Sequence, residues 1–258
     1  MQDLTPYQDV NKVLGLLSSG LQDLLGDQLI GLYLTGSLTY GDFNPDSSDI
    51  DFLAILKIDL TEEQLEKVRQ LHSYIAEEVP HWAKSLEGSY ITGEMLGSIE
   101  APSKERPYVN GGKVSYCAYG NEWIINLYAL QECGQVITGP NLDTMLPNVT
   151  IEQVREASKK DLLKDWVPKI DDPDAFNHPM YDSEHLKNYA TLTMCRILHR
   201  ANNDNMASKK VASKWVKEAY PEWNSLIERA ESWEHGKDMA TDEEVKNFMR
   251  FTLEEVSK

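Results

Sequence analysis

Apolar residues recur along the chain at two spacings, which predict a first half of alternating helices and strands and a second half of helices alone. Residues 7–25 carry apolar side chains at helical spacing, and residues 61–75 begin with a threonine suited to cap a helix. Apolar runs near residues 30–35, 50–56 and 86–92 have the length and composition of strands. The pattern therefore predicts an α/β (α+β) half that precedes an all-α half.

Turn residues predict where these halves meet. Residues 140–148 are rich in turn formers, and we take them as the domain boundary. The helix-compatible segments beyond it are 151–166, 185–200, 208–219, 222–233 and 242–256. In the first half, residues 97–120 contain two prolines and a Gly-Gly pair, which predicts a long loop or hairpin. We expect one domain of residues 1–148 and a helical domain of residues 149–258.

The first predicted strand ends in a glycine and a serine, Gly36 and Ser37. Glycine lets the backbone approach a ligand closely because it has no Cβ. Serine offers a hydroxyl and a backbone N–H where a helix would begin, and such N–H groups are unpaired and bind phosphates. The pair therefore indicates a turn that binds a polyphosphate.

Two aspartates, Asp49 and Asp51, begin the next predicted strand, where a period of two places them on one face. Two neighbouring carboxylates repel unless a cation lies between them, and Mg²⁺ commonly binds one or two carboxylates plus substrate phosphates. Taken separately, the Gly-Ser pair is also typical of an ordinary turn, and the two aspartates of a solvated strand end. Together, with Gly41 between them, they predict a nucleotide site in which Asp49 and Asp51 bind Mg²⁺.

This order of residues, a Gly-Ser pair followed by Asp-Ile-Asp and further apolar residues, resembles the DNA polymerase β-like nucleotidyltransferase superfamily. Within it, the chain resembles the streptomycin/spectinomycin-type aminoglycoside adenylyltransferases over residues 25–255. The segments that carry this likeness are 86–92, 133–140, 192–196 and 207–215. The resemblance implies a nucleotidyltransferase domain with a small mixed sheet, a helical-bundle C-terminal domain, and transfer of AMP from ATP, the co-substrate.

The resemblance also implies roles for single residues. Glu87, on the third predicted strand, matches the glutamate that acts as general base, with Glu94 as an alternative for the same role. From the residues alone, Glu87 is also compatible with a third metal ligand or with an exposed strand position. Arg196 and Lys209 lie in motifs similar to the helical segments that contact the nucleotide phosphates. For these two residues the alternative is an ordinary helix surface.

Acidic residues near the start of a C-terminal helix are the candidates for binding the acceptor. In the resembled enzymes an acidic run helps bind the drug, and Asp182 and Glu184 occupy the corresponding stretch here. The register differs, and Leu186 stands where an acidic residue is expected. The tryptophan that stacks on streptomycin in part of the family has no counterpart, since Trp123 belongs to a different local pattern. Spectinomycin is therefore favoured over streptomycin.

The composition restricts the classes of molecule that the protein is expected to bind. The chain has 258 residues, with 42 acidic against 25 basic side chains and a net charge of −17, which opposes binding to nucleic acid and favours a cationic acceptor. Three separated cysteines form no disulfide framework. No apolar run is long enough for a membrane span, and the N-terminus lacks a signal-peptide pattern. We expect a cytoplasmic monomer without a membrane partner.

The sequence as a whole predicts an Mg²⁺-dependent enzyme that adenylylates a hydroxyl of an aminoglycoside or aminocyclitol and so confers antibiotic resistance. Two alternatives stay open. One is nucleotidyl transfer to another acceptor, a lincosamide or a protein hydroxyl. The other is a non-catalytic nucleotide sensor, although a pure binder would not need the three carboxylates of Asp49, Asp51 and Glu87.

Overall fold

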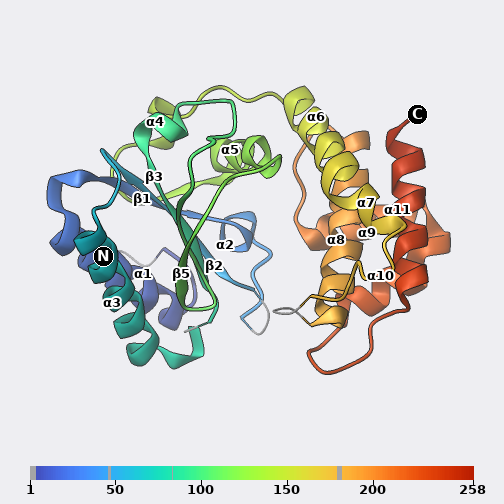
Figure 1. The fold of residues 1–258 in the computed structure, drawn as a ribbon, viewed down its shortest axis with the longest axis horizontal. Coiled ribbons are helices and arrows are strands. Elements are labelled where there is room, and N and C mark those ends of the chain that lie inside the picture. Colours follow the sequence, from blue (N-terminus) through green and yellow to red (C-terminus); the bar gives the residue numbers. More distant parts are fainter. Residues whose placement is uncertain (1–3, 46–47, 83, 179–181) are drawn as a thin grey trace. The chain divides into compact units, whose positions relative to one another are not determined.

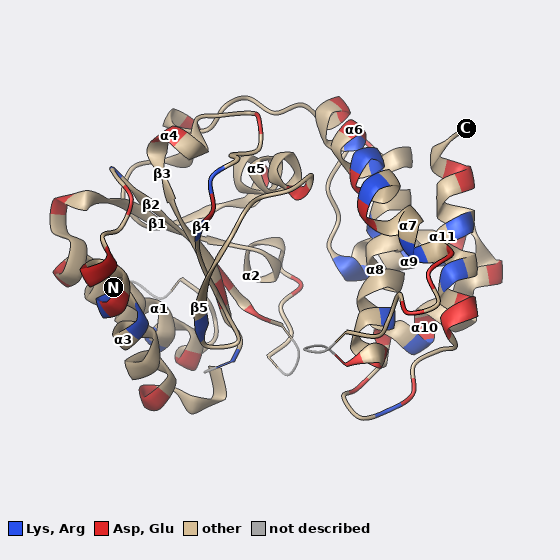
Figure 2. Cartoon of the chain, in the orientation of Figure 1, with Lys and Arg blue, Asp and Glu red and all other residues tan. Residues whose placement is uncertain are grey.

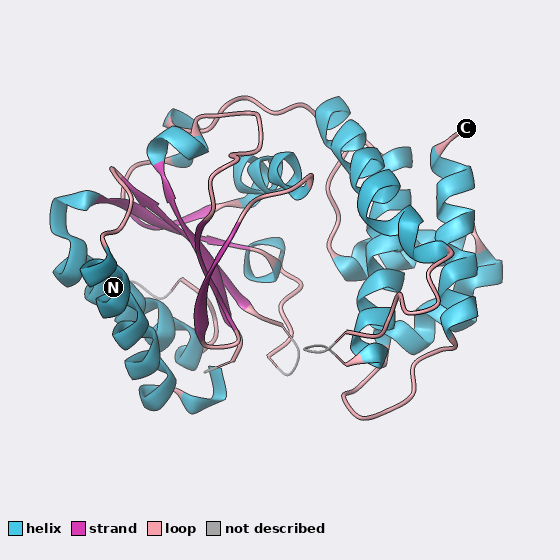
Figure 3. Ribbon diagram, in the orientation of Figure 1, coloured by secondary structure: helices cyan, strands magenta, loops and turns pink. Residues whose placement is uncertain are grey.

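The chain folds into two compact units, Met1–Val149 and Thr150–Lys258 (Figure 1). The computed structural model describes residues 4–45, 48–82, 84–178 and 182–258. All strands of the described chain lie in the first unit, and the described part of the second unit consists of helices and their connections (Figure 3). The predicted fold class, an α/β first half followed by an all-α second half, is confirmed.

The first unit contains one mixed sheet of six strands in the order β5-β4-β3-β2-β1-β6. The strands are β1 (Leu29–Thr35), β2 (Ile50–Leu56), β3 (Leu86–Thr92), β4 (Arg106–Asn110), β5 (Lys113–Cys117) and β6 (Gln135–Thr138). Only the neighbours β2 and β3 run parallel. The predicted hairpin is β4–β5, which turns at Gly111 and Gly112, both at positive φ.

The helices of the first unit are α1 (Gln8–Leu25), α2 (Ser37–Tyr40), α3 (Glu62–Glu78), α4 (Gly93–Leu96) and α5 (Glu122–Cys133). The helix α3 supplies the crossover that a parallel strand pair requires. It begins with a full capping box, in which Thr61 and Gln64 exchange side-chain and backbone hydrogen bonds. The predicted cap at Thr61 is therefore confirmed.

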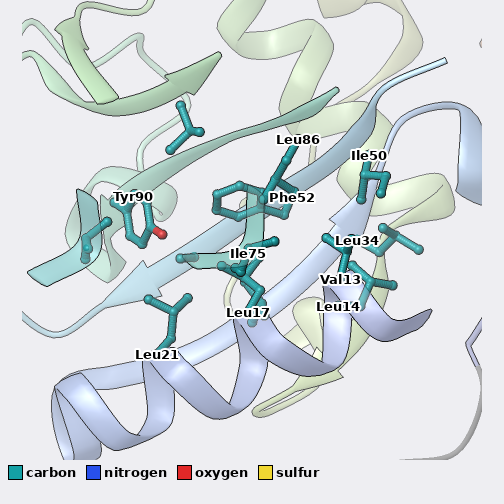
Figure 4. Close-up of a cluster of buried hydrophobic side chains, with 14 of the residues drawn as sticks. Val13, Leu14, Leu17, Leu21, Leu34, Ile50, Phe52, Ile75, Leu86 and Tyr90 are labelled. Carbon is teal, nitrogen blue, oxygen red and sulfur yellow. The ribbon is translucent and has the colours of Figure 1, made fainter. Parts of the chain in front are cut away.

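The main core of the first unit lies between the sheet and the pair α1 and α3. In Figure 4, Leu14, Leu17 and Leu21 of α1 lie against apolar side chains of the sheet. From β2, Ile50 and Phe52 enter this core. Because side chains alternate along a strand, Asp51 between them projects from the opposite face of the sheet. The face of β2 that carries Asp51 is thus the sheet face that α1 and α3 do not cover.

The second unit is built around α8 (Ser183–Asn202), which packs against α6, α9, α10 and α11. The other helices are α6 (Ile151–Asp161), α7 (Val167–Ile170), α9 (Lys209–Ala219), α10 (Asn224–Glu231) and α11 (Asp242–Val256). Acidic residues recur on the helices of both units (Figure 2). No described helix has the length and apolarity needed to cross a membrane.

The predicted helix over residues 151–166 is helical throughout, but its α-helical part, α6, ends at Asp161. A π-helical segment, Leu162–Trp166, follows, and the chain then continues as α7. Pro168 in the first turn of α7 explains the change, since proline has no N–H to donate to the carbonyl group of Lys164. The spacing of apolar residues does not reveal this missing hydrogen bond, so it does not predict the change from α-helix to π-helix.

Candidate active site

The predicted phosphate-binding turn lies where β1 passes into α2. Gly36 adopts φ 70° and ψ −154°, a conformation that is essentially restricted to glycine. A Cβ on Gly36 would lie 1.9 Å from Oδ2 of Asp51, so the missing side chain allows this carboxylate to lie against the turn. Gly36 therefore joins the turn and the acidic strand into one site.

Ser37 is the first residue of α2, which is a single turn of four residues. Its Oγ is buried and has no hydrogen-bond partner within the described residues. A buried hydroxyl without a hydrogen-bond partner costs free energy in the ligand-free protein. The Ser37 hydroxyl is thus suited to bind a ligand oxygen beside Gly36.

The pairing of three strands places the key carboxylates side by side. Asp51 of β2 is the register partner of Thr35 in β1 and of Glu87 in β3. Register partners lie on the same face of a sheet, so Asp51 and Glu87 project together from the face opposite α1 and α3. Both residues are partly exposed. The structure thus brings together two of the three predicted carboxylates on neighbouring strands.

Asp49 differs from the prediction, because β2 begins one residue later, at Ile50. The strand β1 ends at Thr35, the register partner of Asp51. Asp49 is an exposed residue just before β2. Residues 46–47 of the predicted turn before it lie outside the described residues.

The donors at the start of β2 fit Mg²⁺ in kind, because carboxylate oxygens are hard ligands. Over residues 4–45, 48–82, 84–178 and 182–258, no three His, Cys, Asp or Glu side chains gather as a metal-binding group. Asp49 and Asp51 would hold the ion as two protein ligands, and water and phosphate oxygens would complete its coordination. Asp51 lies directly against Gly36, where a Cβ would come within 1.9 Å of its Oδ2, so an ion held by Asp51 would lie beside the turn.

Glu87 accepts a short hydrogen bond from the hydroxyl group of Tyr108 on β4. Burial raises the pKa of Tyr108 well above its ordinary value, and the negative charge of Glu87 raises it further. Tyr108 therefore remains a neutral donor at physiological pH. Tyr108 is not among the site residues that the sequence predicted, although it lies in the region where a hairpin was expected. The alternative base, Glu94, is exposed on α4, past the far end of β3.

The two predicted phosphate contacts lie in the second unit. Arg196 on α8 is partly buried and donates from Nη2 to Oγ1 of Thr193 over 3.3 Å. Its Nε is buried and unpaired within the described chain. Lys209 is exposed at the start of α9, and its Nζ lies 5.9 Å from the ring centroid of Tyr189. Arg196 thus keeps a donor for a further acceptor.

The two predicted acceptor-binding residues have different surroundings. Asp182 is exposed and caps α8 by accepting a 3.1 Å hydrogen bond from the backbone N–H of Glu184. Glu184 binds Nζ of the buried Lys187 at 2.5 Å and accepts the backbone N–H of Met239 at 2.7 Å. Burial opposes ionisation of Glu184, but these hydrogen bonds outweigh it and lower its pKa. Both of its oxygens are engaged within the unit, which leaves Asp182 as the stronger acceptor-binding candidate.

Local packing shows whether Trp123 could stack on a bound ligand. Trp123 on α5 is 2% exposed, and its indole N–H donates to the carbonyl oxygen of Ser98 over 3.0 Å. It is therefore a core residue and does not present its ring to a ligand. Tyr181, which begins the stretch compared with the acidic run of the resembled enzymes, lies outside the described residues.

Comparison with protein families gives the class of this chain. A nucleotidyltransferase domain model matches residues 16–91, which include the Gly36 turn, Asp51 and Glu87. The chain is therefore a nucleotidyltransferase. The model of the aminoglycoside adenylyltransferase C-terminal domain matches residues 144–255. The chain belongs to the aminoglycoside adenylyltransferase family, which confirms the resemblance and favours an enzyme over a non-catalytic sensor.

A solved structure shares the fold. It is the crystal structure of spectinomycin adenyltransferase AAD(9) from Enterococcus faecialis with ATP and spectinomycin, with a TM-score of 0.71 and 20% sequence identity. The match covers 96% of this chain and 99% of that one. At this identity the likeness speaks for the fold. No match was found among curated proteins.

The close approach of Gly36 to Asp51 leads to a prediction with an internal control. Gly41 also has a positive φ, but nothing lies within 4 Å of a Cβ built on it. Gly41→Ala should therefore cost about 1 kcal/mol of backbone strain, whereas Gly36→Ala should cost roughly 2 to 4 kcal/mol and abolish nucleotidyl transfer. Urea unfolding and pyrophosphate release measure both. A Gly36→Ala protein as active as the Gly41→Ala control would contradict the assignment.

Proposed function

We propose that this enzyme transfers AMP from ATP to a hydroxyl group of a small cationic aminocyclitol or aminoglycoside antibiotic, in an Mg²⁺-dependent reaction. The observation that carries the proposal is the register pairing of Asp51 with Glu87, beside the turn at Gly36. It provides a carboxylate for a metal ion next to a carboxylate for a proton. Nucleotidyl transfer to a hydroxyl needs both groups.

The proposed reaction assigns a separate task to each carboxylate. The hydroxyl oxygen of the acceptor attacks the α-phosphorus of ATP, and the bond from that phosphorus to the β-phosphate oxygen breaks, which releases pyrophosphate. Glu87 accepts the proton that the acceptor hydroxyl loses. Asp49 and Asp51 would hold Mg²⁺, which supplies positive charge to the phosphates. Ser37 and the backbone at Gly36 would bind phosphate oxygens.

Spectinomycin is the favoured acceptor, for two reasons. Trp123 is a core residue, so this tryptophan does not offer a stacking platform for streptomycin. The solved structure of similar fold is that of a spectinomycin adenyltransferase. The net charge of −17 favours any such cationic drug. We propose Asp182 as a group that binds its hydroxyl or ammonium groups, with Glu184 mainly holding Lys187 in place.

We assign Arg196 and Lys209 to the phosphates of ATP, and neighbouring lysines allow a controlled test of this role. Lys209 and Lys210 both lie in the first turn of α9, where a positive charge is unfavourable to the helix. Replacing either with glutamine should therefore remove the same unfavourable charge at the start of the helix. Lys209→Gln should weaken ATP binding roughly 10-fold, the loss of one charge-assisted contact, while Lys210→Gln should leave it unchanged. Calorimetric titration with ATP decides this, and equal affinities would refute the role.

The acceptor is identified by measuring pyrophosphate release from Mg-ATP against a panel of aminoglycosides, aminocyclitols and lincosamides. We expect release with spectinomycin and none with the Asp51→Asn protein, which keeps the size of the side chain but loses its charge. The mutant's circular dichroism spectrum serves as the folding control. Pyrophosphate release that occurs only with a lincosamide would show that the acceptor is a lincosamide and not spectinomycin. Full activity of Asp51→Asn would contradict the proposed metal site.

A further inference from the structure

The side chain that contacts Glu87 comes from β4, the next strand in the sheet. Ser89 of β3 is the register partner of Tyr108, so these residues lie on the same face of the sheet. Glu87 precedes Ser89 by two residues and therefore shares that face as well. A tyrosine is long enough to reach such a diagonal neighbour, and its hydroxyl meets Oε1 of Glu87.

The strand that carries Tyr108 is fixed by a buried arginine. Arg106 is 6% exposed, and its guanidinium lies 5.2 Å from the ring centroid of Tyr108. It donates from Nη1 to the carbonyl oxygen of Cys117 at 2.6 Å and from Nε to Oγ of Ser89 at 3.3 Å. Arg106 therefore ties β4 to both β5 and β3. These contacts link the strand that carries Tyr108 to the strand that carries Glu87.

The direction of the hydrogen bond follows from a third residue. Asn110 donates from Nδ2 to the phenol oxygen of Tyr108 over 3.2 Å. The phenol hydroxyl group carries a single hydrogen. Its oxygen already accepts a hydrogen bond from Asn110, and its hydrogen is directed at Glu87. Within the described residues, this is the side-chain hydrogen bond that the structure gives to Glu87. One carboxylate oxygen, Oε1, is thus engaged, while Oε2 is left for another group.

We propose that Tyr108 is a positioning residue for Glu87. Its hydroxyl holds Oε1 and so orients the carboxylate, with Oε2 turned to receive the proton of the acceptor hydroxyl. This inference rests on the proposed role of Glu87 as the base and adds to it a second residue on another strand. A general base works only within hydrogen-bond reach of the proton it accepts, so its orientation affects the chemical step rather than substrate binding.

A purely structural role for Tyr108 makes a different prediction. The ring packs beside Arg106, and a phenylalanine would keep that contact. Tyr108→Phe therefore removes only the hydroxyl. If the hydroxyl merely supported the fold, its loss would lower stability and leave the kinetics of the folded enzyme unchanged. If it orients Glu87, the turnover number falls.

The test compares Tyr108→Phe with a matched control, Tyr116→Phe. Tyr116 is a 45% exposed tyrosine of β5 and pairs with Pro107, which places it on the opposite face from Tyr108. With spectinomycin as acceptor, we expect kcat of Tyr108→Phe to fall roughly 10-fold, the scale of a poorly aligned general base. KM for ATP and for the acceptor should stay within about twofold, because uniform binding is untouched. Tyr116→Phe should match the wild-type enzyme.

A double-mutant cycle shows whether Tyr108 acts through Glu87. In a Glu87→Gln background, which should itself lower kcat roughly 10²-fold or more, Tyr108→Phe should cause little further loss, because the base is already absent. An equal loss in both backgrounds would overturn the positioning role. So would an unchanged kcat in the single mutant.

The same experiment separates this inference from the proposed function. A wild-type protein that releases no pyrophosphate with any acceptor overturns the proposed function and, with it, the role of Tyr108. A wild-type protein that transfers AMP, alongside a fully active Tyr108→Phe protein, overturns the positioning role alone.

Discussion

The parallel pairing of β2 with β3 is the constraint on which the site depends. It sets Asp51 directly opposite Glu87, on strands about 4.8 Å apart. Two carboxylates at such a spacing repel each other unless positive charge or hydrogen-bond donors compensate. Tyr108 supplies a donor to Glu87, and in the proposed mechanism a divalent cation compensates Asp51. In the proposed mechanism this acidic pair serves the bound metal ion and the acceptor.

The hydrophobic core controls this arrangement from the other face of the sheet. Ile50 and Phe52 enter the core beneath α1 and α3, and the alternation of the strand then turns Asp51 outward. A register slip of one residue would bury the aspartate and expose the apolar pair. The interactions that stabilise the first unit thus also orient its carboxylates, and Gly36 gives Asp51 room at the end of β1.

Local signals made much of the fold and of the first unit's site predictable. Thr61 was recognisable as a helix cap, and the pair Gly36 and Ser37 as a special turn, because each depends on neighbours in sequence. Contacts between distant segments were not predictable in this way. The hydrogen bond from Tyr108 to Glu87 depends on strand register, and the engagement of Glu184 with Lys187 and Met239 depends on helix packing.

Metal binding at Asp51 is the central claim of this account, and a direct binding measurement tests it. Mn²⁺, a paramagnetic substitute for Mg²⁺, can be titrated into the protein with ATP and followed by electron paramagnetic resonance. We predict that the wild-type protein binds Mn²⁺ in an ATP-dependent manner and that Asp51→Asn loses most of this binding while it stays folded. Equal Mn²⁺ binding by the two proteins would contradict the account.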